Sequence, residues 1–343
     1  MNIKVLGIDL AKSVFQICAL DNENQVVTNV QVRRARFLSR LSEYPKGTLV
    51  AMEACATCHY WARQCEKMGF EVKIIPTQHV KPLTHTQKND ANDAVAIAEA
   101  AFRPRVKRVS VKTLEQQDLK AWLCIRERTK ANKLALGNQI RAIAAEYGVI
   151  FSVKEGALVH ELPLALESTE NELTDSVREL LSVLLDEFEQ YEEKLDYLTT
   201  KTTAMIKNIE HYKYLVSIPG FGPIVSAHFL AEVGDGLQFS NGRGASAWVG
   251  ITPKVTGTGG KNRTGSITKQ GSCTLRKQLI HGARSVVRVA EKHDDPLSKW
   301  VADLVARRGN NVATVALANK LMRIAWKVLT THEKFDANKA CAV

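Results

Sequence analysis

Apolar positions in the first part of the chain come in short alternating or continuous runs typical of β-strands, separated by polar and glycine-containing turns. The five runs that we predict as strands are residues 3–8, 13–20, 25–32, 48–52 and 70–75. The segments that we predict as helices between them are residues 34–44 and 57–68. A meander followed by alternating helix and strand predicts an α/β domain, with helices packed on a mixed sheet.

The middle of the chain has the apolar period of long helices. A basic linker at 103–108 leads into one helical pattern at 113–147, and helical patterns continue to residue 200. Large apolar side chains recur there at three and four positions: Leu180, Leu181, Leu184, Leu185, Phe188, Tyr191, Leu195 and Leu198. Such a seam predicts a helical hairpin, or a coiled coil that makes the protein at least a dimer.

The last third predicts a second globular part, mainly α, with helices at 275–290 and 312–329. A Pro-Gly-x-Gly turn containing Gly220 and Gly222 resembles the helix-hairpin-helix element, whose backbone N–H groups can hold a phosphate. A simple turn between two helices is the alternative. Residues 254–266 form a basic loop rich in glycine and hydroxyl groups, without the residue order of a Walker loop.

These patterns divide the chain into four parts. They are an α/β domain at 1–105, a helical linker or coiled coil at 106–210, a mainly α domain at 211–335 and a tail at 336–343. With 343 residues, 45% of them hydrophobic, the chain is long enough for two or three packed domains.

Charge is spread unevenly along the chain, whose formal net charge is +11. Residues 155–200 carry 13 Asp or Glu against two Lys or Arg, whereas residues 236–290 carry nine Lys or Arg and no acid. Nucleic acid is the usual partner of a basic surface. We therefore expect the basic block to face nucleic acid and the acidic helices to lie away from it.

The compartment is expected to be the cytoplasm. The chain opens without the charged and apolar regions of a secretory signal, and it has no 18-residue apolar stretch. Its seven cysteines show no spacing that predicts a disulfide framework, which fits reduced thiols. We expect no membrane partner.

Four carboxylates are candidate metal ligands. Asp90 and Asp93 are three positions apart at a predicted helix start, capped by Asn89 or Asp90, and therefore share a helix face. An acidic helix start favoured by the helix dipole is the alternative. Asp9 and Glu53 end the first and fourth predicted strands, where each alone would be an ordinary surface acid. Acids in this order are typical of the RNase H-like fold, in which oxygen ligands on rigid elements converge on two Mg²⁺ ions, so we predict that all four bind Mg²⁺.

Several short motifs, in order, resemble the DEDD transposases of insertion sequences, in particular the IS110 group and its IS1111 branch. The motifs are Gly7-Ile-Asp9-Leu-Ala-Lys12, Met52-Glu53-Ala54, Lys88-Asn-Asp90-Ala-Asn-Asp93-Ala94, Ser217-Ile-Pro-Gly-Phe-Gly222, Gly250-Ile-Thr-Pro253, Gly271, Leu275-Arg276 and Leu279-Ile-His-Gly-Ala-Arg284. Each motif is weak alone, but together they run over nearly the whole chain.

The resemblance implies a RuvC-like N-terminal domain, a coiled-coil insertion and a C-terminal transposase domain. It also implies a tetramer, and a structured guide RNA, the bridge RNA, that pairs with donor and target DNA. In that family a serine just before a glycine attacks DNA, and here Thr258 precedes Gly259. We predict Thr258 as the nucleophile, with Ser266 and Thr256 as alternatives, although the extra methyl of threonine hinders attack. The cations that we expect at nucleic acid are Lys254, Lys261, Arg263, Lys269, Arg276 and Lys277.

Two other functions fit parts of this pattern. A Holliday-junction-type endonuclease would use the carboxylates with water as the nucleophile and would form no covalent intermediate. A non-catalytic nucleic-acid-binding protein would use the acids only as helix caps and strand ends. Mg²⁺-dependent DNA cleavage separates this last function from both enzymes, whereas binding to phosphate does not.

Overall fold

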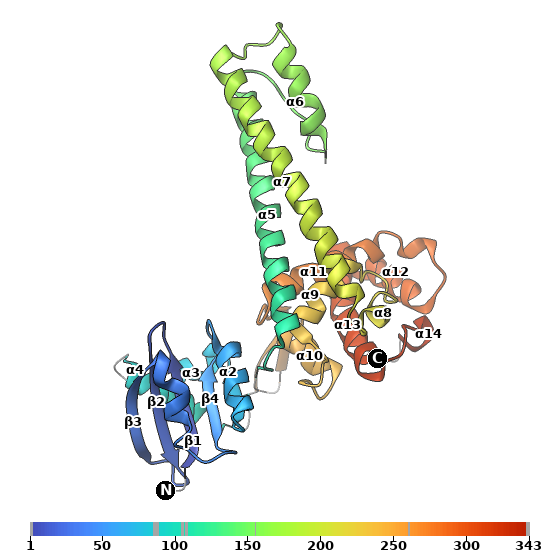
Figure 1. Cartoon of the computed structure of the whole chain (residues 1–343). Helices are drawn as coiled ribbons and strands as arrows, with labels where there is room; N and C mark the ends of the chain where they lie inside the picture. Colours follow the sequence, from blue (N-terminus) through green and yellow to red (C-terminus); the bar gives the residue numbers. More distant parts are fainter. Residues whose placement is uncertain are drawn as a thin grey trace. The chain divides into compact units, whose positions relative to one another are not determined.

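A computed structural model describes residues 3–84, 89–103, 106, 109–154, 156–259 and 261–340 (Figure 1). The chain divides into two compact units, Met1–Thr113 and Leu114–Val343. Across the described ranges, no helix has both the length and the apolar character needed to cross a membrane. The predicted boundaries at 105 and 210 remain predictions.

The first unit is built on one five-stranded sheet in the order β3-β2-β1-β4-β5. The strands are β1 (Ile3–Leu10), β2 (Val14–Asp21), β3 (Val26–Arg33), β4 (Leu49–Glu53) and β5 (Glu71–Ile75). β2 pairs antiparallel with both β1 and β3, whereas β4 is parallel to both β1 and β5. The structure therefore confirms the predicted mixed sheet and all five predicted strands.

Helices cover both faces of this sheet. The unit's helical segments are η1 (Arg34–Arg36), α1 (Phe37–Leu41), α2 (Cys58–Lys67), α3 (Thr77–Val80), η2 (Lys81–Leu83) and α4 (Asp90–Ala100). On one face, Phe15, Phe37 and Trp61 meet edge to face with ring centroids 5.0 to 5.2 Å apart. α4 packs its alanines on the other face. The helix predicted at 34–44 is shorter than expected, because Pro45 disfavours helical geometry at the residue before it.

A long antiparallel helical hairpin opens the second unit, formed by α5 (Leu114–Ala145) and α7 (Asp175–Lys207) (Figure 1). α6 (Ala157–Glu167) packs against α7, and the helical pattern breaks before Thr174, which caps α7. The predicted apolar seam lies within this chain: its fully or nearly buried members are Leu181, Leu185, Phe188 and Leu198. The seam thus forms the hairpin that was one of its two predicted uses, and self-association remains a prediction.

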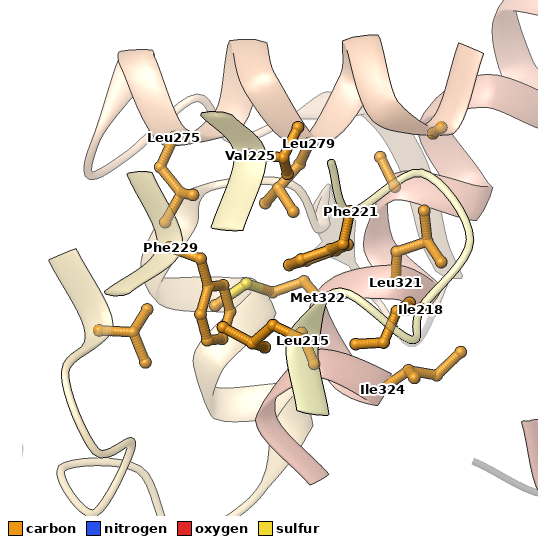
Figure 2. Packing of buried hydrophobic residues seen from close by; sticks show 14 of the residues in the cluster. Leu215, Ile218, Phe221, Val225, Phe229, Leu275, Leu279, Leu321, Met322 and Ile324 are labelled. Carbon is orange, nitrogen blue, oxygen red and sulfur yellow. The ribbon is translucent and has the colours of Figure 1, made fainter. Parts of the chain in front are cut away.

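The rest of the second unit is a helical core. Its helical segments are α8 (Tyr212–Leu215), α9 (Pro223–Val233), α10 (Gly242–Val249), α11 (Cys273–Val287), η3 (Ala290–Lys292), α12 (Pro296–Arg308), α13 (Asn310–Thr331) and α14 (Ala337–Ala340). Figure 2 shows Phe221 and Phe229 between side chains of α11 and α13. Their ring centroids are 5.7 Å apart. α11 and α13 correspond to the two predicted helices, whereas α10 and α12 had no sequence prediction.

The predicted loop at 254–266 is instead an antiparallel two-stranded ribbon, β6 (Pro253–Thr258) and β7 (Lys261–Ile267). The expectation of irregular structure was wrong. Almost every ribbon residue is exposed, and strands without a buried face do not show the alternation of apolar and polar residues by which a strand is recognised in a sequence. β-branched residues such as Val255 and Thr264, which are paired across the ribbon, favour this extended conformation.

Candidate active site

Asp9 and Glu53 lie side by side at one edge of the first unit's sheet. β1 and β4 are parallel, and the last pair of residues in register between them is Ile8 and Met52. The next residue of each strand is therefore one of the two acids, and neighbours in register point to the same face of a sheet. Gly7 and Ala51, two positions earlier, are also register partners, and Gly7 faces α4. Both acids thus project on the side of the sheet that α4 covers.

Gly7 lets α4 approach the sheet closely. A Cβ at this position would lie 2.3 Å from the carbonyl oxygen of Ala94 and 2.7 Å from the Cβ of Ala98. Only a residue without a side chain fits at this contact. The absent side chain therefore sets the height of α4 above β1, and with it the position of Asp90 and Asp93 over Asp9.

The first turn of α4 is also fixed by polar contacts. Asn89 caps the helix, its side-chain oxygen accepting from the backbone N–H of Asn92 at 2.8 Å. Asn29 of β3 donates through Nδ2 to the carbonyl of Ala91 at 3.1 Å. Gln16 of β2, only 8% exposed and the register partner of Asp9, donates through Nε2 to Asn29 at 2.7 Å. The helix start that carries both aspartates is therefore tied to the sheet.

Electrostatics show that the four predicted carboxylates share one neighbourhood. The pKa of Asp9 is raised from 3.8 to about 6, mainly by burial and then by the negative charges of Asp90, Asp93 and Glu53, in that order. The four acids come from three separate elements, β1, β4 and α4. The structure thus brings together acids that are more than eighty positions apart in the sequence.

These acids lie near one another but do not form a closed cage of ligands. In the part of the chain that the structure describes, no three His, Cys, Asp or Glu side chains are close enough together to enclose a metal ion. Mutual repulsion keeps uncompensated carboxylates apart. Mg²⁺ keeps several waters and is usually held by one or two carboxylates together with substrate phosphates, so an open set of hard oxygen donors fits this ion.

The ribbon in the second unit presents the predicted nucleophile. Thr258 pairs with Lys261 and Thr256 with Arg263, and directly paired residues share a face of the ribbon. One face therefore carries two hydroxyls and two cations, all exposed. Ser266 lies where the register of the ribbon shifts, between the Val255–Thr264 and Pro253–Ile267 pairs, so the pairing does not assign it to either face. It stays an alternative nucleophile beside the two threonines.

Two predicted cations lie at the base of the ribbon. Lys269 is exposed and donates its backbone N–H to the carbonyl of Gly250 at 3.0 Å. Arg276 uses its guanidinium on the backbone instead, because Nη1 donates to the carbonyls of Val249 and Gln270 at 2.9 and 2.8 Å. Arg276 thus fastens the ribbon to α11, and its predicted contact with nucleic acid would have to be shared with this structural role.

The remaining predicted residues also have defined places. Lys254 is an exposed residue of β6, and Lys277 forms an ion pair with Glu127 of α5 at 3.1 Å. Gly220 packs against α11, since a Cβ on it would lie 2.6 Å from the carbonyl of Gly282. Gly222 precedes α9 and has open space around it. The turn therefore has a packing role at its first glycine, and phosphate binding at the second remains a prediction.

Sequence reasoning missed the residues that position α4. Gln16 was a detectable signal, because it is the one polar residue within the apolar run Val-Phe-Gln-Ile-Cys-Ala-Leu of β2. Asn29 and Gly7 carried no such signal, since glycine and asparagine are also frequent in turns. Their roles depend on which helix crosses the strands.

The sheet order, with acids at adjacent strand ends and at the start of the crossing helix, is that of the RNase H-like class of nucleic-acid enzymes. A family model for DEDD transposases of the IS110 type, described as "Transposase", matches residues 6–148. A second model, described as "Transposase IS116/IS110/IS902 family", matches residues 212–297. The chain belongs to the IS116/IS110/IS902 family and is a DNA transposase.

Relatives match along almost the whole chain. A "Probable family 20 transposase" of Pseudomonas aeruginosa is 39% identical, covering 96% of this chain and 98% of the relative. The "Transposase for insertion sequence element IS1111A" of Coxiella burnetii is also 39% identical, over 97% and 92%. The "Transposase for insertion sequence element IS1328" of Yersinia enterocolitica is 32% identical, over 98% and 99%.

Proposed function

We propose that this transposase cuts and rejoins DNA with Mg²⁺ held by Asp9, Glu53, Asp90 and Asp93 and with a hydroxyl nucleophile, Thr258, on the ribbon. The observation that carries the proposal is the raised pKa of Asp9, to which burial contributes most and the three other acids add. Such a concentration of negative charge stabilises the protein poorly by itself, and a bound divalent cation relieves it.

Each group has a defined task in this proposal. Bound Mg²⁺ would polarise the phosphodiester and offset the charge that develops on it. The carboxylates would orient the scissile phosphate over the sheet edge, and Lys261 and Arg263 would hold the flanking phosphates beside Thr258. The acidic hairpin helix α7 would repel nucleic acid and leave it to the basic surfaces.

The covalent step exchanges one phosphate ester for another. The Thr258 Oγ1 attacks the phosphorus, a Thr258 Oγ1–P bond forms and one P–O bond to deoxyribose breaks. The threonine proton passes to solvent base, and the departing deoxyribose oxygen takes up a proton. Attack by a hydroxyl of another strand reverses these changes and releases the threonine, so that strands are exchanged without a net loss of ester bonds.

Asp93→Asn tests the metal site. We expect cleavage of the element's DNA ends to be abolished while nucleic-acid binding persists, because the amide keeps the shape and loses the charge. Glu99→Gln is the matched control: it makes the same acid-to-amide change at an exposed position of the same helix, and it should cleave normally. Normal cleavage by Asp93→Asn would refute the metal assignment.

Thr258→Ala tests the nucleophile. We expect it to eliminate the covalent protein–DNA adduct, whereas Thr258→Ser should restore the adduct because it keeps the hydroxyl and removes the hindering methyl. Thr256→Ala and Ser266→Ala are the controls on the same ribbon. An adduct of normal yield from Thr258→Ala would move the role to another hydroxyl. Cleavage without any adduct in the wild type would instead support the junction-resolving endonuclease with water as nucleophile.

Guidance by RNA is the remaining part of the proposal. The acid-free segment at 236–290 and the net charge of +11 support binding to more than one nucleic acid. If pairing supplies the target sequence, the protein recognises duplex shape and backbone rather than base edges. Sequencing the RNA that copurifies with the protein tests this. A discrete species encoded beside the gene supports guidance, and random cellular RNA contradicts it.

A further inference from the structure

A basic pocket lies in the first unit on the sheet face opposite α4. Its volume is about 670 Å³, and its lining residues are Lys12, Ser13, Val14, Arg33, Arg34, Ala35, Leu38 and Trp61. The floor is apolar, because Trp61 belongs to the aromatic cluster of this face. Three cations, from the turn after β1 and the end of β3, surround it. The proposed roles of the carboxylates and of the ribbon use none of these residues.

The cations of this pocket are not neutralised within the protein. In the part of the chain that is described, neither Lys12, Arg33 nor Arg34 forms an ion pair with a carboxylate. Arg34 is held by other means: its guanidinium lies 5.1 Å from the Trp61 ring centroid and donates to the carbonyl of Lys12 at 3.3 Å. Lys12 and Arg33 are exposed. The pocket therefore offers a ligand one held cation, Arg34, and two exposed cations, Lys12 and Arg33.

The pocket opens at the same edge of the sheet as the carboxylates. β3 runs parallel to β1, because both pair antiparallel with β2, so Arg33 and Asp9 lie at the same ends of their strands. Lys12 follows Asp9 by three residues, which limits the separation of their Cα atoms to about 11 Å. Successive phosphates of an unstacked strand are several ångströms apart, so a strand bound at the carboxylates reaches this position with the nucleotides next to the scissile bond.

We infer that this pocket binds the DNA strand being cut, taking a base and its phosphates close to the scissile bond. The inference rests on the proposed function of the carboxylates. Charge complementarity selects a polyanion, and the apolar floor of Leu38 and Trp61 suits the face of an unstacked base. A duplex would present its phosphates but no free base face to this floor, so the occupant is single-stranded near the cut.

Removal of two exposed cations tests whether the positive charge of the pocket binds phosphates. In an Asp93→Asn background, which separates binding from cleavage, Lys12→Ala with Arg33→Ala should weaken binding of a fluorescent 20-nucleotide single-stranded DNA about tenfold. It should also reduce the slope of log K against log salt by about 1.4, the value for two phosphate contacts on a single strand. Arg34 is left in place because it packs on Trp61.

The matched control removes the same charge from the opposite end of the sheet. Lys46 precedes β4 and Lys67 ends α2, so Lys46→Ala with Lys67→Ala should leave both the affinity and the salt slope unchanged. If both double variants lose the same affinity, the loss reflects only the protein's net charge and not the pocket, and the inference is overturned.

Filling the pocket tests the base contact without changing charge. Ala35 lines the pocket and is exposed, so Ala35→Trp should fold normally, weaken single-stranded binding about tenfold and keep the wild-type salt slope. Unchanged binding by Ala35→Trp would overturn the inference. Losses seen with RNA of the same sequence but not with DNA would also overturn it, because the occupant would then be the guide. Failure of the Asp93→Asn cleavage test would refute the metal site and leave these binding results standing.

Discussion

The carboxylate edge of the first unit and the basic ribbon of the second hold their candidate residues in opposite ways. Asp9 is the last but one residue of β1 and Glu53 is the last residue of β4, and both strands are largely buried. α4 is pressed on the sheet at Gly7 and tied to it by Asn29. The ribbon's described residues are almost all exposed, and backbone hydrogen bonds fasten it at its base. Packing therefore determines the geometry of the first site, whereas charge and backbone pairing determine that of the second.

This difference separates two kinds of mutational sensitivity. A change that shifts α4 moves two proposed ligands at once, and catalysis is sensitive to displacements of about 1 Å. A change on the ribbon alters contacts to a partner and leaves the fold intact. The contrast predicts that stability and activity fall together at the sheet edge and separately on the ribbon.

Gly7→Ala should have the largest effect. The new Cβ would overlap the backbone of α4, so we expect a loss of about 3 kcal/mol in the unfolding free energy of the first unit. Cleavage by the molecules that remain folded should fall by about 100-fold or more, because Asp90 and Asp93 move away from Asp9. Thermal unfolding and a cleavage assay on the folded fraction measure the two effects.

Gly265→Ala on β7 is the matched control for this change. The nearest atom to its Cβ would be the carbonyl oxygen of Lys254 at 3.9 Å, an ordinary contact. Its unfolding temperature should match that of the wild type. If both alanine variants behave alike, close packing does not determine the geometry of the sheet edge, and the contrast between the two regions fails.

In the second unit, the Glu127 carboxylate joins α5 to α11, the helix that follows the ribbon in the sequence. Glu127 of α5 accepts from Lys277 at 3.1 Å and from Gln278 at 3.2 Å, both on α11. The His228 ring, and then Lys277, lower the pKa of Glu127 from 4.5 to about 2 against the opposing effect of burial. His228 lies 3.8 Å away, too far for a good hydrogen bond, whereas Lys277 and the neighbouring Arg126, at 3.2 Å, form ion pairs with Glu127 directly.

Glu127→Gln should have an intermediate effect that depends on pH. Since the carboxyl titrates lower in the folded chain, its stabilisation is complete above about pH 4.5 and is lost as pH falls towards 2. We expect the variant to be about 2 to 3 kcal/mol less stable at pH 7 and about equal to the wild type near pH 2. Denaturant unfolding across pH measures this. Glu210→Gln, in an exposed pair with Lys213, should show no such trend.

The two regions also differ in how far the sequence alone predicts them. Four of the five strands bury apolar side chains and β3 has partly buried valines, so the apolar alternation of the strands is visible in the sequence. Asp9 and Glu53 are then placed at or next to strand ends. The ribbon has no buried face, so its sequence predicts a loop rather than two strands. The contacts of Gly7, Asn29 and Arg276 were not predictable, because each depends on an element distant in the sequence.

Lys261→Ala with Arg263→Ala should have the smallest effect on the fold and a clear effect on binding. Both side chains are exposed on the face that carries Thr258, so the unfolding free energy should change by less than about 0.5 kcal/mol. Affinity for duplex DNA should fall about tenfold and the salt slope by about 1.8, the value for two contacts on a duplex. Lys201→Ala with Lys207→Ala on α7 removes equal charge beside the acidic hairpin and should leave the affinity unchanged. A ribbon variant that loses stability as well as affinity would show that packing, rather than charge, holds the ribbon, and the two regions would then follow the same rule.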